Sequence, residues 1–213
     1  AGAHSGISVG PDGATHQALE DIAITRVLPN LVVVVPADAV EAKKATLAAA
    51  AINGPVYFRF GREKVATITT EKTPFTVGKA EVYREGRDVA LVACGLMVHR
   101  ALLAAEELEK RGISAMVINN HTIKPLDRKT LIYAAQTCGA VVTAEEHQIN
   151  GGMGSAVAEL LSQERPVPIR MVAVQDRFGE SGGSEELLDM VGLTVDHIVE
   201  EAKKAVAMKK RGR

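Results

Sequence analysis

The stretch LVVVVPADAVEAKKATLAAAA, residues 31–51, decides the fold. Its first five residues, Leu31–Val35, are uniformly apolar and mostly β-branched, which is typical of a strand covered on both faces in a parallel sheet. After a turn, Asp38 with Glu41 three residues later predicts a capping box for an alanine-rich helix. A buried strand followed at once by a helix predicts an α/β fold.

The alternation of strand and helix extends on both sides of this stretch. A helix is predicted over Gln17–Arg26 and a strand over Val56–Phe60. The apolar periodicity then fades into Thr, Lys, Glu and Pro between Lys64 and Pro74, which indicates a linker. We therefore expect two domains, residues 1–74 and 75–213.

The second domain continues the alternation through short connections. Lys79–Tyr83 and Asp88–Cys94 look like two strands joined by a turn at residues 84–87. Short connections between strands and helices predict doubly wound parallel sheets in three layers, so we expect two α/β/α domains, the first lacking its opening strands and helices. Further helices are predicted over Val98–Lys110, from the cap Asp127 to Cys138, from Gly154 through Leu161 and after the cap Thr194, and further strands over Ser114–Asn119, Ala140–Ala144 and Ile169–Val174.

Composition excludes several classes of function. The 25 basic and 26 acidic residues nearly cancel, which gives no global charge for binding nucleic acid or an anionic membrane. The longest apolar runs fall far below the roughly 20 residues of a spanning helix, and no signal peptide opens the chain. Cys94 and Cys138 stand alone, without the spacing of a zinc site or a disulfide framework. We expect a globular cytoplasmic protein.

The stretch HSGISVGPDGATHQ, residues 4–17, gathers residues that carry chemistry. It sets His4, Asp12 and His16 among three glycines and one proline. Glycine permits unusual backbone angles, proline stiffens a turn, and imidazole and carboxylate groups bind hydroxyls or move protons near neutral pH. The spacing alone leaves another interpretation open, in which Asp12 caps a helix, His16 is structural and His4 belongs to a frayed end. Because the cluster opens the chain, we expect further residues before it.

Two other features follow predicted strands. Arg62 comes just after a strand, where the ligand crevice of a doubly wound sheet lies and a planar guanidinium can bind phosphate, although a surface or interface role stays open. Arg59, inside the strand, suits a domain interface. The run Gly151–Gly154 resembles a phosphate cradle but lacks the spacing of a dinucleotide or P-loop fingerprint, so we favour a structural turn. The segments 145–147 and 177–182 lie at the ends of predicted strands, and they too could form a crevice or a subunit contact.

These patterns together resemble transketolase over essentially the whole chain. The similarity is strongest to the separate C-terminal subunits of split bacterial and archaeal transketolases. The stretches that carry it are residues 4–17, 20–23, 28–30 and 35–38, and in the second part 123–127 (IKPLD), 144–147 (AEEH), 151–157 (GGMGSAV) and 178–182 (FGESG).

The resemblance implies a partial thiamine-diphosphate pyrimidine-binding domain followed by a transketolase C-terminal domain. Transketolase, an enzyme of the pentose phosphate pathway, transfers a two-carbon ketol unit from a ketose phosphate to an aldose phosphate, with the thiamine ylid as nucleophile. By this resemblance, Asp12 accepts a hydrogen bond from the sugar C2 hydroxyl, and His4 and Arg62 bind the substrate near its phosphate. His16 lies beside the cofactor and assists proton transfer at the reacting carbonyl.

The same resemblance implies that essential parts lie elsewhere. The glutamate and the aromatic residue that act on the aminopyrimidine would precede Ala1. The diphosphate and Mg²⁺ are held in another domain by a Gly-Asp-Gly motif, and Pro11-Asp12-Gly13 lacks its first glycine. We therefore expect no metal site in this chain and no activity from it alone. The implied partners are an N-terminal transketolase subunit, a second copy in a homodimer, and sugar phosphates.

Two alternatives stay open. Deoxyxylulose phosphate synthase shares the Asp-Gly-x-Thr-His element, although His4, placed twelve residues before His16, favours transketolase. A non-catalytic module for dimerisation or regulation would account for the missing cofactor groups. Gly6 stands where many transketolases have serine, which leaves the implied substrate roles intact.

Overall fold

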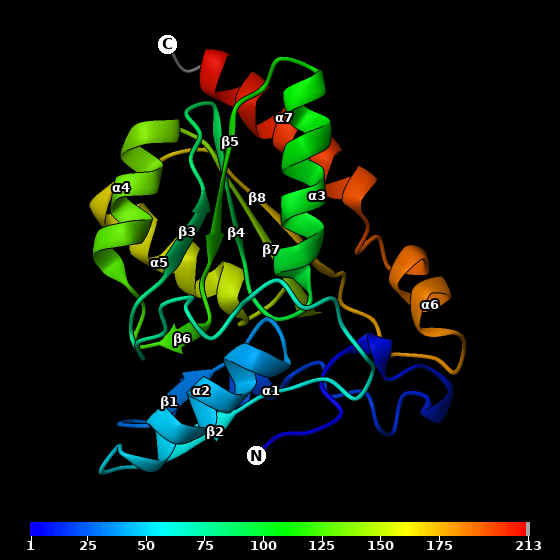
Figure 1. Ribbon diagram of the computed structural model, residues 1–213. Coiled ribbons are helices and arrows are strands. Elements are labelled where there is room, and N and C mark those ends of the chain that lie inside the picture. The colour runs from blue at the N-terminus through cyan, green and yellow to red at the C-terminus, as the bar shows by residue number, and fades with distance from the viewer. Residues whose placement is uncertain (212–213) are drawn as a thin grey trace.

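A computed structural model describes the backbone of residues 1–211 and the side chains of residues 1–209 (Figure 1). Its elements are the 3₁₀ segment η1 (Ile7–Asp12), α1 (Asp21–Arg26), β1 (Val32–Val34), α2 (Ala39–Ala50), β2 (Val56–Phe58), β3 (Glu81–Arg84), β4 (Val89–Ala93), α3 (Met97–Lys110), β5 (Ala115–Asn119), β6 (Thr122–Lys124), α4 (Arg128–Cys138), β7 (Val141–Gln148), α5 (Met153–Glu164), β8 (Ile169–Val174), α6 (Ser184–Met190) and α7 (Val195–Arg211).

The larger sheet has the strand order β3-β5-β4-β7-β8. The strands β5, β4, β7 and β8 pair in parallel, and β3 joins one edge antiparallel to β5. Helices α3 and α7 cover one face and α4 and α5 the other (Figure 1). Every residue of β4 and β5 is buried, as expected for strands covered on both faces. The predicted three-layer α/β/α architecture is therefore confirmed for this part of the chain.

The smaller sheet combines strands from distant parts of the chain, in the order β2-β1-β6. β1 pairs in parallel with β2, and β6 joins its other edge in antiparallel orientation. The first residues extend the sheet beyond β2, since the Gly2 amide donates to the Phe58 carbonyl at 2.7 Å. Because β1 precedes residue 74 and β6 follows it, the hydrogen bonds between these two strands cross the predicted division between the domains. That division stays a prediction.

The expected helix caps form, but the predicted capping box forms only in part, since the Glu41 carboxylate accepts from the Ala37 amide at 2.6 Å, one residue before Asp38. The Asp38 carboxylate accepts a hydrogen bond from the Glu41 amide at 2.9 Å and also from the amides of Ile68 and Thr69, at 2.8 and 2.6 Å. The predicted linker, which contains no helix or strand, is thus docked on the N-terminus of α2. The caps Asp127 and Thr194 also form, with bonds from the amides three residues ahead.

Two local expectations need correction. The helix predicted from Gln17 begins only at Asp21, because the Ala18 amide donates to the His4 carbonyl and the Ala18 carbonyl accepts from the Gly6 amide. These bonds hold the segment alongside the opening loop. β3 and β4 are joined by a turn as expected, but β5 lies between them in the sheet. Within residues 1–211, no helix combines the length and apolar character needed to cross a membrane.

Candidate functional site

The opening loop brings two of the predicted site residues together. The imidazole rings of His4 and His16 lie edge to face, with 6.1 Å between their centroids. His16 is exposed and His4 is half-buried. The Thr15 hydroxyl lies 2.9 Å from Nδ1 of His16 and is hydrogen-bonded to it. The pair therefore presents ring nitrogens on the surface of the protein.

Asp12 and Arg62, the other two predicted site residues, form an ion pair in which a guanidinium N–H donates to the carboxylate. Their side chains are 32% and 43% exposed, so both reach solvent. The Ser5 amide donates to the Phe60 carbonyl at 3.2 Å, which joins the loop of His4 to the segment of Arg62. The structure thus places all four predicted residues on two adjoining segments at one surface.

The loop is held by side chains that lie far away in the sequence. The Ser8 amide donates to the carboxylate of Glu146, which lies in the second half of β7. Gly6 adopts φ +86°, and a Cβ atom there would lie 2.1 Å from the Glu146 carboxyl carbon. Glycine is therefore required at this position both by its backbone conformation and by the close approach of Glu146.

The run Glu145-Glu146-His147, for which the sequence suggested a crevice or a subunit contact, is buried, and Glu146 lines a cleft. Burial raises the pKa of both carboxyl groups. The Glu145 carboxylate accepts from the amides of Met153 and Gly154, at 2.6 and 2.7 Å. These bonds satisfy the N-terminus of α5, so the glycine run before that helix is a structural turn and not an open phosphate cradle.

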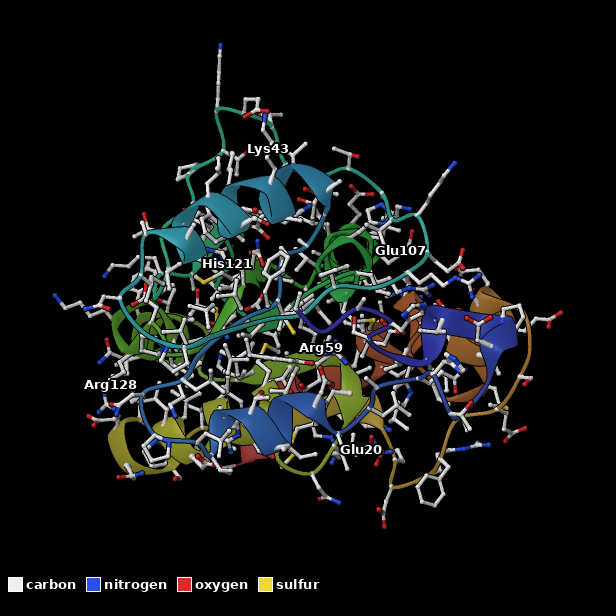
Figure 2. The ribbon with its side chains drawn as sticks, turned by 90° about the horizontal axis from the view of Figure 1, so that it is seen from below. Glu20, Lys43, Arg59, Glu107, His121 and Arg128 are labelled. Atoms are coloured by element: carbon white, nitrogen blue, oxygen red, sulfur yellow. The ribbon has the colours of Figure 1, made fainter. Side chains whose placement is uncertain are left out.

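Arg59 links three parts of the molecule from a buried position, near the centre of the view in Figure 2. Its guanidinium donates to the Asp21 carboxylate and to the backbone carbonyls of Ala18 and Glu146, all within 3.0 Å. These contacts join residues on both sides of the predicted domain division, as the interpretation of Arg59 as an interface residue expects.

A cleft of about 750 Å³ borders the loop. The carboxyl ends of β1, β2 and β4 line it, together with Ser8 and Glu146. Ligand crevices of doubly wound sheets form at this end of the strands. The sequence predicted a crevice beyond the strand that precedes Arg62, and the cleft lies there, but none of the four predicted site residues lines it. Its position between strands of two different sheets gave no signal in the sequence. Sequence reasoning also missed the contact between Ser8 of the loop and Ser184, since a lone serine gives no signal in the sequence.

Metal coordination is a separate question. Among the residues that the structure describes, no group of three or more His, Cys, Asp or Glu side chains is arranged to hold a metal ion. The carboxylates nearest the loop are engaged in hydrogen bonds or ion pairs within the chain.

Family models match most of the chain. Residues 1–67 match the pyrimidine binding domain of transketolase, and residues 78–198 match the transketolase C-terminal domain. A 6-deoxy-6-sulfo-D-fructose transketolase subunit of Clostridium sp. (strain MSTE9) is 45% identical over 94% of this chain and 62% of that protein. A putative transketolase C-terminal section of Methanocaldococcus jannaschii is 40% identical over 94% of this chain and 65% of that protein.

Solved structures give the same result. A split gene transketolase, described as an inactive β4 tetramer, matches with a TM-score of 0.91 and 46% identity, over 97% of this chain and 66% of that one. Transketolase from Campylobacter jejuni matches with a TM-score of 0.77 and 26% identity, over 95% of this chain and 30% of that one. The chain thus spans just under two thirds of its subunit-sized relatives. From its two domain matches and these relatives, the chain belongs to the transketolase family.

Proposed function

We propose that this chain supplies the substrate-facing side of a transketolase active site, which transfers a two-carbon ketol unit from a ketose phosphate to an aldose phosphate. The observation that supports it best is the meeting of His4, Asp12, His16 and Arg62 on two adjoining surface segments. Imidazole, carboxylate and guanidinium groups are the donors and acceptors that a phosphorylated sugar requires.

Each group has a role in this proposal. Asp12 accepts a hydrogen bond from the C2 hydroxyl of the sugar, and a substrate of the other configuration leaves that acceptor unpaired. Arg62 offers its planar fork to the terminal phosphate, and His4 donates beside it. His16 gives and takes a proton at the reacting carbonyl oxygen, which is the general acid and base role that imidazole side chains commonly have in enzymes.

The ion pair between Asp12 and Arg62 suggests how the substrate binds. Both groups are charged and partly exposed, so a substrate phosphate can replace the Asp12 carboxylate on Arg62. The released carboxylate is then available to the sugar hydroxyl. Binding of the two ends of the substrate is thereby coupled.

The residues of this chain fit one side of thiamine diphosphate. His16 and His4 present exposed or half-exposed ring nitrogens to a neighbouring group. The N-terminus of α5 is already satisfied by Glu145, so it does not bind the diphosphate. When bound, the cofactor supplies the nucleophilic carbon that carries the two-carbon unit. We propose that the diphosphate and Mg²⁺ are held by another subunit.

That subunit is, in this proposal, an N-terminal transketolase subunit, because the relatives include a C-terminal section and a split gene product. The relative described as an inactive β4 tetramer supports both inactivity of this chain alone and association of its copies, including a homodimer. Cys94 and Cys138 are free and buried, which agrees with the reducing cytoplasm as its location.

Reconstitution tests the proposal. The gene product that contains this chain is mixed with the N-terminal subunit, thiamine diphosphate and Mg²⁺, and ketol transfer between sugar phosphates is measured. His16→Ala is expected to lower kcat by about a hundredfold or more, as for the loss of a general acid and base. Asp12→Ala should lower kcat/KM.

The matched control is His197→Ala, an imidazole half-buried on α7. It should leave ketol transfer unchanged. Activity that survives both His16→Ala and Asp12→Ala would overturn the residue assignments. Consumption of pyruvate by the assembled protein would instead indicate deoxyxylulose phosphate synthesis, and assembly without any turnover would favour a non-catalytic module.

A further inference from the structure

Ser8 lies midway between two of the site residues, four positions after His4 and four before Asp12. Both polar groups of its backbone are bound by the C-terminal part of the chain. The Ser8 amide donates to the Glu146 carboxylate on β7, and the Ser8 carbonyl accepts from the Ser184 hydroxyl at 2.6 Å. Ser184 is the first residue of α6. Figures 1 and 2 both show η1 lying against α6.

A third contact joins the opening loop to the residues just before α6. The Gln17 side-chain amide donates to the Glu180 carbonyl at 2.8 Å and also reaches the Ile7 and Gly10 carbonyls, at 3.2 and 3.3 Å. A Cβ atom on Gly179 would lie 1.6 Å from the Gln17 side-chain oxygen. Residues 179–184 therefore contact the loop directly, and at Gly179 there is no room for a larger side chain.

The backbone of the loop needs such support. His4 adopts φ +60°, and Gly6, Gly10 and Gly13 have φ between +76° and +86°. A non-glycine residue in the left-handed region costs free energy, and such conformations persist only where the surroundings determine them. Burying the Glu146 carboxyl group is also unfavourable, and burial raises its pKa. Its hydrogen bond to the Ser8 amide offsets part of that cost.

We propose that Glu146 and Ser184 are positioning residues for the substrate loop. By binding the backbone amide and the backbone carbonyl of Ser8, they set the separation of His4 from Asp12 and hence the fit of the sugar phosphate. This inference rests on the proposed function for its catalytic consequence, whereas the clamp on the loop is a property of the chain itself. It gives the C-terminal part of the chain a direct influence on substrate turnover.

The test uses Ser184→Ala in the complex with the N-terminal subunit, thiamine diphosphate and Mg²⁺. Loss of one hydrogen bond should raise amide hydrogen exchange in residues 6–13 about fivefold to tenfold and lower kcat/KM for the ketose phosphate by a similar factor. Binding of thiamine diphosphate, measured by titration, should not change. Ser184→Thr keeps the hydroxyl and should restore both the exchange and kcat/KM.

The matched control is Ser162→Ala, which removes a serine hydroxyl that donates to the Glu159 carbonyl at 3.1 Å on α5. It should alter neither exchange in the loop nor kcat/KM. Glu146→Gln retains an acceptor for the Ser8 amide and should keep exchange in residues 6–13 at the level of the parent protein, which controls for loss of the carboxylate charge, whereas faster exchange in this variant would show that the acceptor alone does not hold the loop.

Exchange in residues 6–13 that is the same in Ser184→Ala and the parent protein would overturn the clamp. Faster exchange in the loop with unchanged kcat/KM would overturn its role in turnover. If the parent complex transfers no ketol unit, the proposed function fails, and the exchange measurement alone still decides whether Ser184 holds the loop.

Discussion

Arg59 and Asp21 form a buried ion pair, with 2.8 Å between Nε and the carboxylate and side-chain exposures of 3% and 13%. Burial alone would raise the pKa of Asp21, but the charge and hydrogen bond of Arg59, together with the hydrogen bond from the Tyr57 hydroxyl and the charge of His147, outweigh it, so that the pKa lies below its ordinary value. Arg59 also donates to the backbone carbonyl of Glu146, which ties α1 and the end of β2 to β7. The pair therefore holds together the two sheets that frame the candidate site.

Removing this arginine should be costly. Arg59→Met leaves the Asp21 carboxylate buried without its counter-ion, and we expect the free energy of unfolding to fall by about 3–5 kcal/mol. Urea denaturation measures the change. Arg128→Met breaks an exposed pair with Glu164 and should cost less than about 1 kcal/mol. Equal losses in the two variants would contradict the importance of the buried pair.

Acid should destabilise the fold through His121. Its side chain is fully buried and stacked on Phe75, with 4.3 Å between ring centroids, and burial lowers its pKa from 6.5 to about 4. Between these values the unfolded chain binds a proton that the folded chain does not. This contribution to stability is therefore complete above pH 6.5, is lost as the pH falls to about 4 and changes no further below it.

The size of that loss is about 3 kcal/mol for the single residue, an upper estimate from the shift in pKa. Urea unfolding of the parent protein and of His121→Gln, at several pH values, isolates it from the other titrating groups. The variant should lose less stability on acidification. Parallel pH profiles for the two proteins would exclude His121 as the cause.

Loss of Arg62 should weaken substrate binding more than turnover. A charged hydrogen-bonding group at the substrate phosphate contributes about 1.5–3 kcal/mol, so Arg62→Ala should raise KM for the ketose phosphate about tenfold to hundredfold in the reconstituted enzyme. Arg84 lies on β3 of the larger sheet and forms an ion pair with Glu109 on α3. Arg84→Ala should leave KM unchanged. A fall in kcat at constant KM would argue against a phosphate contact.

A substitution at Gly152 tests the hydrogen bonds between Glu145 and the N-terminus of α5. A Cβ atom there would lie 2.4 Å from a Glu145 carboxylate oxygen, and that oxygen cannot move without losing its bond to the Met153 amide. We expect Gly152→Ala to lower stability by about 1–3 kcal/mol in thermal unfolding. Gly54→Ala, where nothing lies within 4 Å of the new Cβ, should be close to neutral. A neutral Gly152→Ala would show that the Glu145 contact is looser than described.

The fold was predictable where one residue type or one period carries the signal. The Asp38 and Asp127 caps and the strand Ile169–Val174 formed as expected. In contrast, β6 is three residues long and is defined only by its partner β1, so no local pattern reveals it. Gln17 fits a helical period but takes part in long-range bonds, which outweigh that local preference.

The residue types of the candidate site could be predicted from the sequence, but the distant residues that hold its loop in place could not. Glycines, histidines and an aspartate in one short stretch predict a functional loop, and the structure brings the predicted residues to one surface. The residues that hold this loop, Glu146 and Ser184, lie more than 130 positions further on, and a buried carboxyl group is opposite to what hydropathy predicts. Only the folded arrangement shows that they meet at Ser8.

The pairing of β1 with β6 has a practical consequence for dividing this protein. A cut at residue 74, where composition changes, would separate two hydrogen-bonded strands and leave β1 with an unprotected edge. Exposed apolar edges recruit other chains and promote aggregation. Expression of either half by itself is thus expected to yield insoluble material, and co-expressed halves should recover solubility only to the extent that the strand pair reforms.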